Sequence, residues 1–409
     1  MLPRLLRLPS TAPPRRPPSR RLSSTARPLT PSFGSEVSGV DLSQLLRRPA
    51  SLAEYISLVY RRGVVVFREQ QHLTPHEELA FARAFNHQPD PPGETSYTGG
   101  AAPQAKLPPP LEDIAVIGTF RLAEYHGFTG ESAGVYPPWP KGQLAWHMDG
   151  LADTVPPPDL TTMRCIATPR EGGETIFRCA RRPASRLQRV RVGGADVDPE
   201  LVRIRYKLPK QSRLRASGYS LDWAAGGRED DAEVNMAAGT EWPLLIREPI
   251  TGQRSLLSTY HVASGLVLDE RGHVAHELDF DQANELVENV WALPGADGAT
   301  FSGLNGSKAE EVAAPGFADD ARCMAAYQQE RVLEAKDEVI LHQWRVGDLV
   351  AWSNRLVIHS ATSTKLYAPG ATRIHHRIRL RSADNHKPSA WREHPHALYE
   401  RMRDATSNH

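Results

Sequence analysis

The strongest constraint on the fold is that apolar residues come in short runs separated by turn residues. Runs of this length, rich in β-branched residues, predict strands rather than helices. In the last third of the chain they cover Val339 to Trp344, Leu349 to Trp352, Leu356 to His359 and Arg373 to Leu380. Before that they cover Phe33 to Leu42, Gly63 to Phe67, Ile114 to Gly118, Leu160 to Ile166, Gly172 to Phe177 and a strand pair, Pro243 to Arg247 with Ser255 to Ser258.

Two of these predicted strands differ in the burial that we expect. In Phe33 to Leu42 apolar residues alternate with small polar ones, which is typical of an edge strand. Gly63 to Phe67 is an uninterrupted β-branched run, which is typical of a strand that is buried on both faces.

Helical signals are few. Ser51 and Glu54 form a predicted capping box before apolar residues at helical spacing. A second helix begins with Thr74 as N-cap and reaches about Phe85, and two more are expected, over Asp281 to Leu293 and Ala318 to about Ala335. Many short strands with few helices predict a mainly β fold with flanking helices, a double-sheet structure of the jelly-roll kind.

The composition is that of a globular protein with an ample core. The 409 residues carry a net charge of +1, with 40% hydrophobic and 24% charged residues, so neither nucleic acid nor a membrane surface is indicated as a partner. The three cysteines are scattered, which argues against a disulfide framework and a zinc ribbon and favours a reducing compartment. We expect a small-molecule partner, and the oligomeric state stays open, a homo-oligomer included.

The predicted boundaries follow shifts in composition. Residues 1–30 are rich in arginine and serine and contain no acidic residue, which is typical of a mitochondrial transit peptide. The same composition fits a disordered extension equally well. The location is therefore expected to be cytoplasmic or the mitochondrial matrix. One domain should span residues 31–385, with insertions at about 87–141 and 180–240, before a tail at 386–409.

His147 and Asp149 carry the first half of a predicted metal site. Residues two apart on a strand project from one face, so an imidazole and a carboxylate would share one point in space. A second, distant histidine would complete the 2-His-1-carboxylate arrangement of non-haem iron enzymes. The similar His76-Glu77-Glu78 is a decoy, because His76 falls in the first turn of the predicted helix that Thr74 caps.

The stretch from Gly347 to His359 carries the second half. A Gly-Asp turn, an apolar strand and a polar Ser-Asn-Arg reversal lead to His359 at the end of the next strand, and Arg373 follows. A histidine presented in this way can bring a third ligand to the metal.

With these motifs the sequence resembles the taurine dioxygenase (TauD/TfdA-like) family of Fe(II)/2-oxoglutarate-dependent dioxygenases. The resemblance runs from Phe33 to about Asp384 through FGSEVSGVDL, VVVFREQ, WHMD, GGETIF, PLLIREPITGQ, GDLVAWSNRLVIH and TRIHHR. It implies a double-stranded β-helix, the jelly roll of the clavaminate synthase-like kind. It also implies a dioxygenase that uses Fe(II), 2-oxoglutarate and O2 and releases succinate and CO2.

The resemblance assigns roles residue by residue. His147, Asp149 and His359 would be the catalytic metal ligands. Arg373 would pair with the distal carboxylate of 2-oxoglutarate, and Thr175 would hydrogen-bond the same group. Arg377 and Gln143 match substrate-binding positions, although a solvated arginine and a structural glutamine remain equally open. On a strand Arg373, His375, Arg377, Arg379 and Arg381 share a face, and the later ones are expected to reach solvent.

Departures from the family pattern leave the substrate open. Ser353 replaces the aspartate of the usual Trp-Asp-Asn-Arg, and both insertions enlarge regions where such enzymes build substrate pockets. A small polar, anionic substrate is expected, a sulfonate such as taurine or a carboxylate. WHMD followed by a Pro-Pro-Pro segment and TMRCIATP also resembles the fungal xanthine dioxygenase branch. Two interpretations belong to other functional classes. One is a zinc hydrolase that uses the same three ligands, and the other is a barrel that serves as a binding module without metal.

Overall fold

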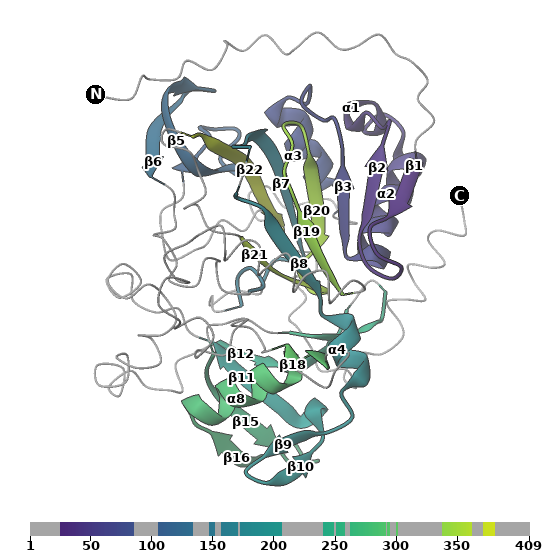
Figure 1. The fold of residues 1–409 in the computed structure, drawn as a ribbon, viewed down its shortest axis with the longest axis vertical. Coiled ribbons are helices and arrows are strands. Elements are labelled where there is room, and N and C mark those ends of the chain that lie inside the picture. The colour runs from purple at the N-terminus through teal and green to yellow at the C-terminus, as the bar shows by residue number, and fades with distance from the viewer. Residues whose placement is uncertain are drawn as a thin grey trace.

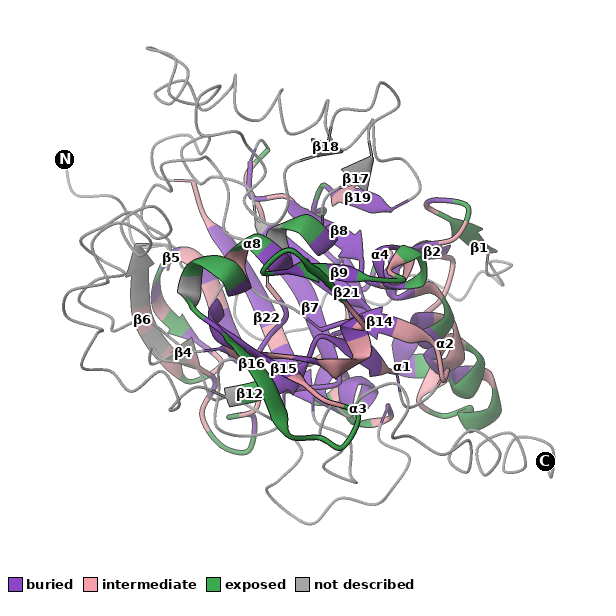
Figure 2. Cartoon of the chain, turned by 90° about the horizontal axis from the view of Figure 1, so that it is seen from below, coloured by how far each residue is buried: buried purple, intermediate pink, exposed green. Residues whose placement is uncertain are grey.

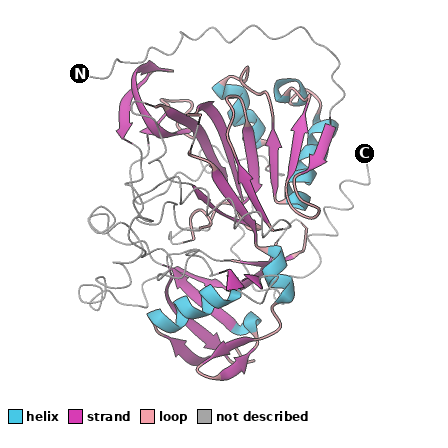
Figure 3. Ribbon diagram, viewed as in Figure 1, coloured by secondary structure: helices cyan, strands magenta, loops and turns pink. Residues whose placement is uncertain are grey.

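The computed structural model of the chain describes residues 25–85, 105–133, 147–151, 157–170, 172–206, 240–248, 251–257, 262–291, 293–294, 300–301, 338–361 and 371–380. The helix predicted at 318–335, the predicted tail at 386–409 and Gln143 lie outside these residues. In the described part strands outnumber helices, so the prediction of a mainly β chain with flanking helices is confirmed (Figures 1 and 3). None of the described helices is long and apolar enough to cross a membrane.

The largest sheet joins strands from both halves of the chain. Its order is β1-β2-β3-β20-β7-β22-β5-β4, with β6 also paired to β5, and only β2 and β3 pair in parallel. The strands are β1 (Thr25–Pro28), β2 (Ser35–Ser38), β3 (Val64–Phe67), β20 (Leu349–Ser353), β7 (Leu160–Ala167), β22 (Arg373–Leu380), β5 (Ala115–Tyr125), β4 (Ala105–Lys106) and β6 (Phe128–Ala133).

A smaller antiparallel sheet packs against one face of the large one. It consists of β19 (Val339–His342), β8 (Thr175–Cys179) and β21 (Val357–Ala361), in that order. Phe177 and Val357 of the small sheet share an apolar cluster with Val350 and Trp352 of β20. This cluster is the core between the two sheets, and side chains that enter it come from both.

Three helices cover the opposite face of the large sheet: α1 (Leu42–Leu45), α2 (Pro49–Arg62) and α3 (Pro75–Arg83) (Figure 3). Phe81 of α3 packs with Val65 and Phe67 of β3 in a second apolar cluster. Val64 and Val66 belong instead to the cluster between the sheets, so β3 is buried on both faces, as its uninterrupted apolar run predicts. Figure 2 shows the inner strands buried and the outer helix faces exposed.

A third group of elements forms the lower part of Figure 1 around its own apolar cluster. The four-stranded sheet β12-β11-β15-β16 carries α8 (Phe280–Trp291), and β13 pairs with β14 as predicted. The elements are β9 (Val190–Val192), β10 (Ala195–Val197), η1 (Pro199–Leu201), β11 (Val202–Tyr206), β12 (Thr240–Pro243), β13 (Leu245–Arg247), β14 (Arg254–Leu256), β15 (Val262–Leu268), β16 (Val274–Leu278) and α4 (Arg181–Arg186). β17 (Leu293–Pro294) pairs with β18 (Thr300–Phe301) in a separate two-stranded sheet.

Several local expectations need correction. β2 is an inner strand, because β1 pairs along one side of it and β3 along the other, and β1 lies within the predicted N-terminal extension. α2 begins two residues before Ser51, with Arg48 as N-cap and Pro49 in the first turn, where its fixed φ suits a helix start. Thr74 is the N-cap of α3 as predicted, and it forms a capping box with Glu77.

The two predicted insertions contain regular structure where they are described. In 181–206, which lacks firm periodicity in the sequence, there are a helix and three short strands. Likewise β6 extends the sheet beyond β5 in a stretch that was expected to be irregular. The domain boundaries themselves stay predictions.

Candidate metal centre

Backbone pairing brings His147 and His359 side by side. The His147 N–H donates to the His359 carbonyl at 3.0 Å, and the His359 N–H donates to the His147 carbonyl at 2.9 Å. This reciprocal pair is an isolated bridge: His359 lies in β21, whereas His147 belongs to none of the described strands. Opposite residues of an antiparallel pair place their side chains on the same face, so both imidazoles project to one side.

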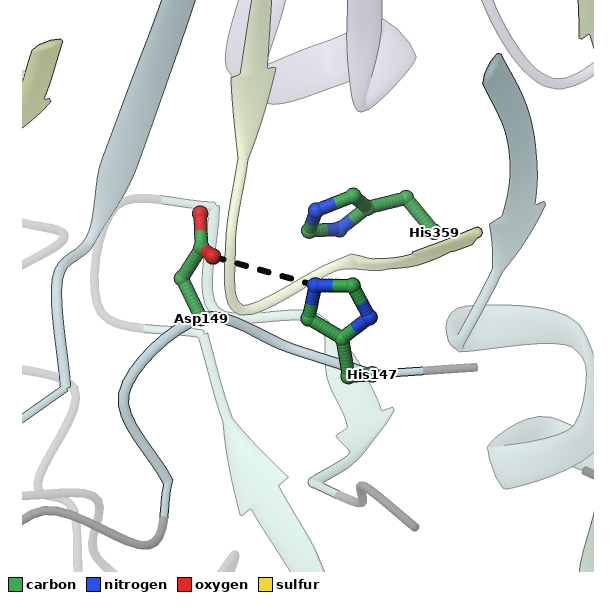
Figure 4. A group of neighbouring side chains, drawn as sticks. All are labelled: His147, Asp149 and His359. Carbon is green, nitrogen blue, oxygen red and sulfur yellow. Dashed lines mark ion pairs between the residues drawn. The ribbon is translucent and has the colours of Figure 1, made fainter. Parts of the chain in front are cut away.

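The expectation that His147 and Asp149 share a strand is wrong, because the chain turns at Asp149 and Gly150 has a φ of 77°. The turn still brings the carboxylate to the histidines. His147 Nε2 lies 3.9 Å from Asp149 Oδ1, and the two imidazole ring centroids are 4.2 Å apart. One ligand atom from each of the three residues lies within 4.8 Å of the others, and the three side chains converge in Figure 4.

Asn354 fixes the backbone of Asp149. Its Oδ1 accepts from the Asp149 N–H at 2.9 Å, and its Nδ2 donates to the Asp149 carbonyl at 2.8 Å and to the Pro158 carbonyl at 3.0 Å. The hydroxyl of Thr161 donates to Asp149 Oδ2 at 2.9 Å. One carboxylate oxygen is thus held by the protein, while Oδ1 is the oxygen that lies toward His147.

The charge states of Asp149 and His359 suit a divalent metal. Burial opposes ionisation of Asp149, but the charge of Arg377, with smaller effects of His359 and Arg379, lowers the pKa of Asp149 well below its ordinary value. Burial and the nearby His147 lower the pKa of His359 to about 3. A carboxylate and neutral imidazoles are the protonation states in which these groups bind metals.

His359 is enclosed by aromatic rings. The indole of Trp352 lies 5.1 Å from its ring centroid, and the ring of Phe177 stacks at 6.3 Å. His359 is 7% exposed, and its Nδ1 has no hydrogen-bond partner among the described residues. An apolar wall of this kind holds the ring in place and limits the access of water.

Thr175 and Arg373 lie on the inner faces of the two sheets. The indole N–H of Trp344 donates to Thr175 Oγ1 at 3.0 Å, so the hydroxyl proton of Thr175 can be directed to another acceptor. Arg373 is the first residue of β22. Burial raises the pKa of the Cys165 thiol, which belongs to the core between the sheets, and the positive charge of Arg373 opposes that rise. Arg373 is 6% exposed, and its Nε has no partner in the described part of the chain.

Two further arginines of β22 approach the triad. Arg377 Nη1 lies 3.7 Å from Asp149 Oδ1. Arg379 is also buried, so the expectation that it reaches solvent is wrong, whereas Arg381 and Gln143 lie outside the described residues. β22 is buried at both ends, and among its residues Arg377 alone is partly exposed. His76 is exposed in the first turn of α3, as predicted for the decoy.

Three comparisons with known proteins agree. The family model "Taurine catabolism dioxygenase TauD, TfdA family" matches residues 25–189, a segment that contains His147, Asp149 and Thr175. The chain is 24% identical to the Alpha-ketoglutarate-dependent xanthine dioxygenase xanA of Emericella nidulans over 404 residues, which covers 89% of this chain and 98% of that protein. It is 24% identical to the Alpha-ketoglutarate-dependent 2,4-dichlorophenoxyacetate dioxygenase of Cupriavidus pinatubonensis, over 83% of this chain and 92% of that one.

The fold is similar to that of a taurine dioxygenase from Burkholderia xenovorans, with a TM-score of 0.51 and 17% identity. That match covers 90% of this chain and 96% of the other. The family match begins with β1 and includes two of the three triad residues, and both relatives align over most of their length. The chain therefore matches the TauD/TfdA family model over residues 25–189 and is similar over most of its length to two 2-oxoglutarate-dependent dioxygenases.

Proposed function

We propose that the protein hydroxylates a small, polar, anionic organic substrate, with O2 and 2-oxoglutarate consumed and succinate and CO2 released. The two facing sheets would be the walls of a double-stranded β-helix, and His147, Asp149 and His359 would hold Fe(II) between them. The observation that carries the proposal is the convergence of these three ligand atoms within 4.8 Å of one another.

The three residues fit iron by the chemistry of their donors. Two imidazoles and one carboxylate form a facial set that leaves coordination positions open for cosubstrate, substrate and O2. When bound, Fe(II) would supply the oxidative chemistry that a protein side chain cannot perform. The chain's part is to keep Asp149 ionised and to fix it through Thr161 and Asn354.

Arg373 and Thr175 would bind the distal carboxylate of 2-oxoglutarate. A buried guanidinium with an unpartnered Nε is costly unless an anion compensates it, and a carboxylate matches its geometry. The Thr175 hydroxyl already accepts from Trp344, so it is left to donate to that carboxylate.

Arg377 supports an anionic primary substrate. Its guanidinium lies 3.7 Å from the carboxylate of the triad, so a sulfonate or carboxylate held there would place its neighbouring carbon close to the metal. The 2,4-dichlorophenoxyacetate dioxygenase relative is named for a carboxylate. With a sulfonate on the reacting carbon, hydroxylation would give an aldehyde and sulfite.

Xanthine is the second candidate. The relative that is named for this substrate aligns over 98% of its length. A planar purine would need several donors and acceptors, for which the carboxamide of Gln143 is suited. The same iron chemistry serves both candidates, so only the substrate differs.

The test has two stages. First, anaerobic protein with Fe(II) and 2-oxoglutarate should show the weak visible charge-transfer band of the chelate, whereas a zinc hydrolase or a metal-free barrel would show none. Second, succinate release should be measured with alkylsulfonates, short carboxylates, sulfate esters and xanthine. Stimulation by xanthine alone would replace the anion proposal by the purine one.

A further inference from the structure

His375 is a buried polar side chain to which the site described so far assigns no role. It lies on β22 between Arg373 and Arg377 and is 0% exposed. Neither ring nitrogen has a hydrogen-bond partner among the residues that the structure describes. A buried polar atom that is left unpaired is destabilising, so an imidazole with two unpartnered nitrogens calls for a ligand that completes it.

The side chain of His375 points into the space between the two sheets. Its ring packs edge-on against the indole of Trp344 at 4.5 Å, and Trp344 belongs to the cluster between the sheets. The next residue, His376, faces the other way, where its Nδ1 lies 2.8 Å from Glu78 Oε2 of α3. This alternation fixes His375 on the same face as Arg373 and Arg377.

Trp344 connects His375 to the cosubstrate end of the site. The same indole that touches His375 donates its N–H to Thr175 Oγ1 at 3.0 Å. Arg373 lies two residues before His375 on the same face, a spacing of roughly 7 Å along a strand. His375 thus stands beside both groups, Thr175 and Arg373, that would hold the distal carboxylate of 2-oxoglutarate.

The protonation state of His375 supports a neutral donor. Burial, followed by the positive charge of Arg373, lowers the pKa of His375 well below its ordinary value. A neutral imidazole has one N–H to donate and one nitrogen that accepts. Thr175 and a neutral histidine would add two directed donors to the charge of Arg373.

We propose that His375 is a third binding residue for the distal carboxylate of 2-oxoglutarate and donates one ring N–H to it beside Arg373 and Thr175. This inference rests on the proposed use of 2-oxoglutarate. It makes His375 a residue that selects 2-oxo acids with a second carboxylate over those without one.

The experiment measures binding rather than turnover. Anaerobic isothermal titration calorimetry of the Fe(II)-loaded protein would compare 2-oxoglutarate with 2-oxopentanoate, which keeps the 2-oxo acid but has a methyl group in place of the distal carboxylate. His375→Leu should raise the Kd for 2-oxoglutarate roughly 10-fold to 100-fold, the range for a hydrogen bond to a charged group, and leave that for 2-oxopentanoate unchanged. His375→Gln, which retains a donor, should recover most of the affinity.

Two controls keep the result decisive. His376→Gln changes the neighbouring residue on the opposite face while retaining a donor for Glu78, and it should leave the Kd for 2-oxoglutarate unchanged. If His375→Leu does not fold, as judged by circular dichroism, His375→Phe provides a second variant without a donor.

An unchanged Kd for 2-oxoglutarate in the folded variants would overturn the inference. So would an equal loss for both 2-oxo acids, or an equal loss in His376→Gln, because either shows a general disturbance of β22. Failure of the wild-type protein to bind 2-oxoglutarate would refute the proposed function itself, and the two failures are thereby distinguished.

Discussion

Asn354 offers the sharpest test of how the metal centre is built. The side chain is 1% exposed and makes three hydrogen bonds, to the N–H and carbonyl of Asp149 and to the carbonyl of Pro158. Asn354→Ala deletes all three and leaves buried backbone groups unpaired. At about 1 kcal/mol for each bond, and more for a buried group without a partner, the free energy of unfolding should fall by about 3–5 kcal/mol.

The same variant should also weaken metal binding. The Asp149 backbone would lose its two anchors, so the carboxylate would no longer be held at the histidines. Loss of a supporting hydrogen bond behind a metal ligand typically costs about 10-fold to 100-fold in affinity. Chemical denaturation of the metal-free protein gives the stability change, and anaerobic calorimetry with Fe(II) gives the Kd.

The neighbouring Ser353→Ala is the matched control. Ser353 is 0% exposed, but its hydroxyl has no hydrogen-bond partner among the described residues. Its removal should change stability by less than about 1 kcal/mol and leave the Kd for Fe(II) unchanged. Folded Asn354→Ala protein with wild-type affinity for Fe(II) would refute the idea that Asn354 positions Asp149.

Three further predictions concern the ligands, the cosubstrate and acid stability. His147→Ala, Asp149→Ala and His359→Ala should each abolish succinate release with circular dichroism unchanged, and a variant with near wild-type turnover would remove that residue from the ligand set. Arg373→Ala should raise the 2-oxoglutarate concentration needed for half-maximal turnover at least about 100-fold, because a buried charge pair loses one side; an unchanged requirement would move the role to Arg377. Burial opposes ionisation of Glu78, but Arg164 and His376 lower the pKa of Glu78, so its stabilisation is present above about pH 4.5 and lost as the pH falls through the lower folded-state value. Denaturation of Glu78→Gln between pH 6 and pH 3 should show a shallower loss than the wild type, and equal slopes would exclude Glu78 as the source.

The strands could be predicted where the sequence pattern is local. The continuous apolar run of Val64 to Phe67 has no polar residue to place on a solvent face, so burial on both faces follows from the sequence. The start of α2 differs from the prediction because Pro49, two residues ahead of Ser51, supplies a competing start signal.

The site could be predicted only at the level of residue types and order. Their spacing and the surrounding motifs predict His147, Asp149 and His359 as ligands, and the structure brings the three together. The roles of Asn354 and Thr161 depend on hydrogen bonds between residues far apart in the chain, and Asn354 in the sequence looks like an ordinary turn residue. The unpaired state of His375 likewise depends on the packing of Trp344, which no local pattern reveals.

The backbone pairing of His147 and His359 also couples metal binding to folding. The two ligands come from distant parts of the sequence and meet only through the reciprocal hydrogen bonds between their segments. An unfolded chain therefore offers no assembled chelate, and metal should bind the native state far more tightly than the denatured one. By mass action, a free metal concentration one hundred times the Kd would stabilise the native state by about 2.7 kcal/mol. The melting temperature of the protein should therefore rise with the free metal concentration.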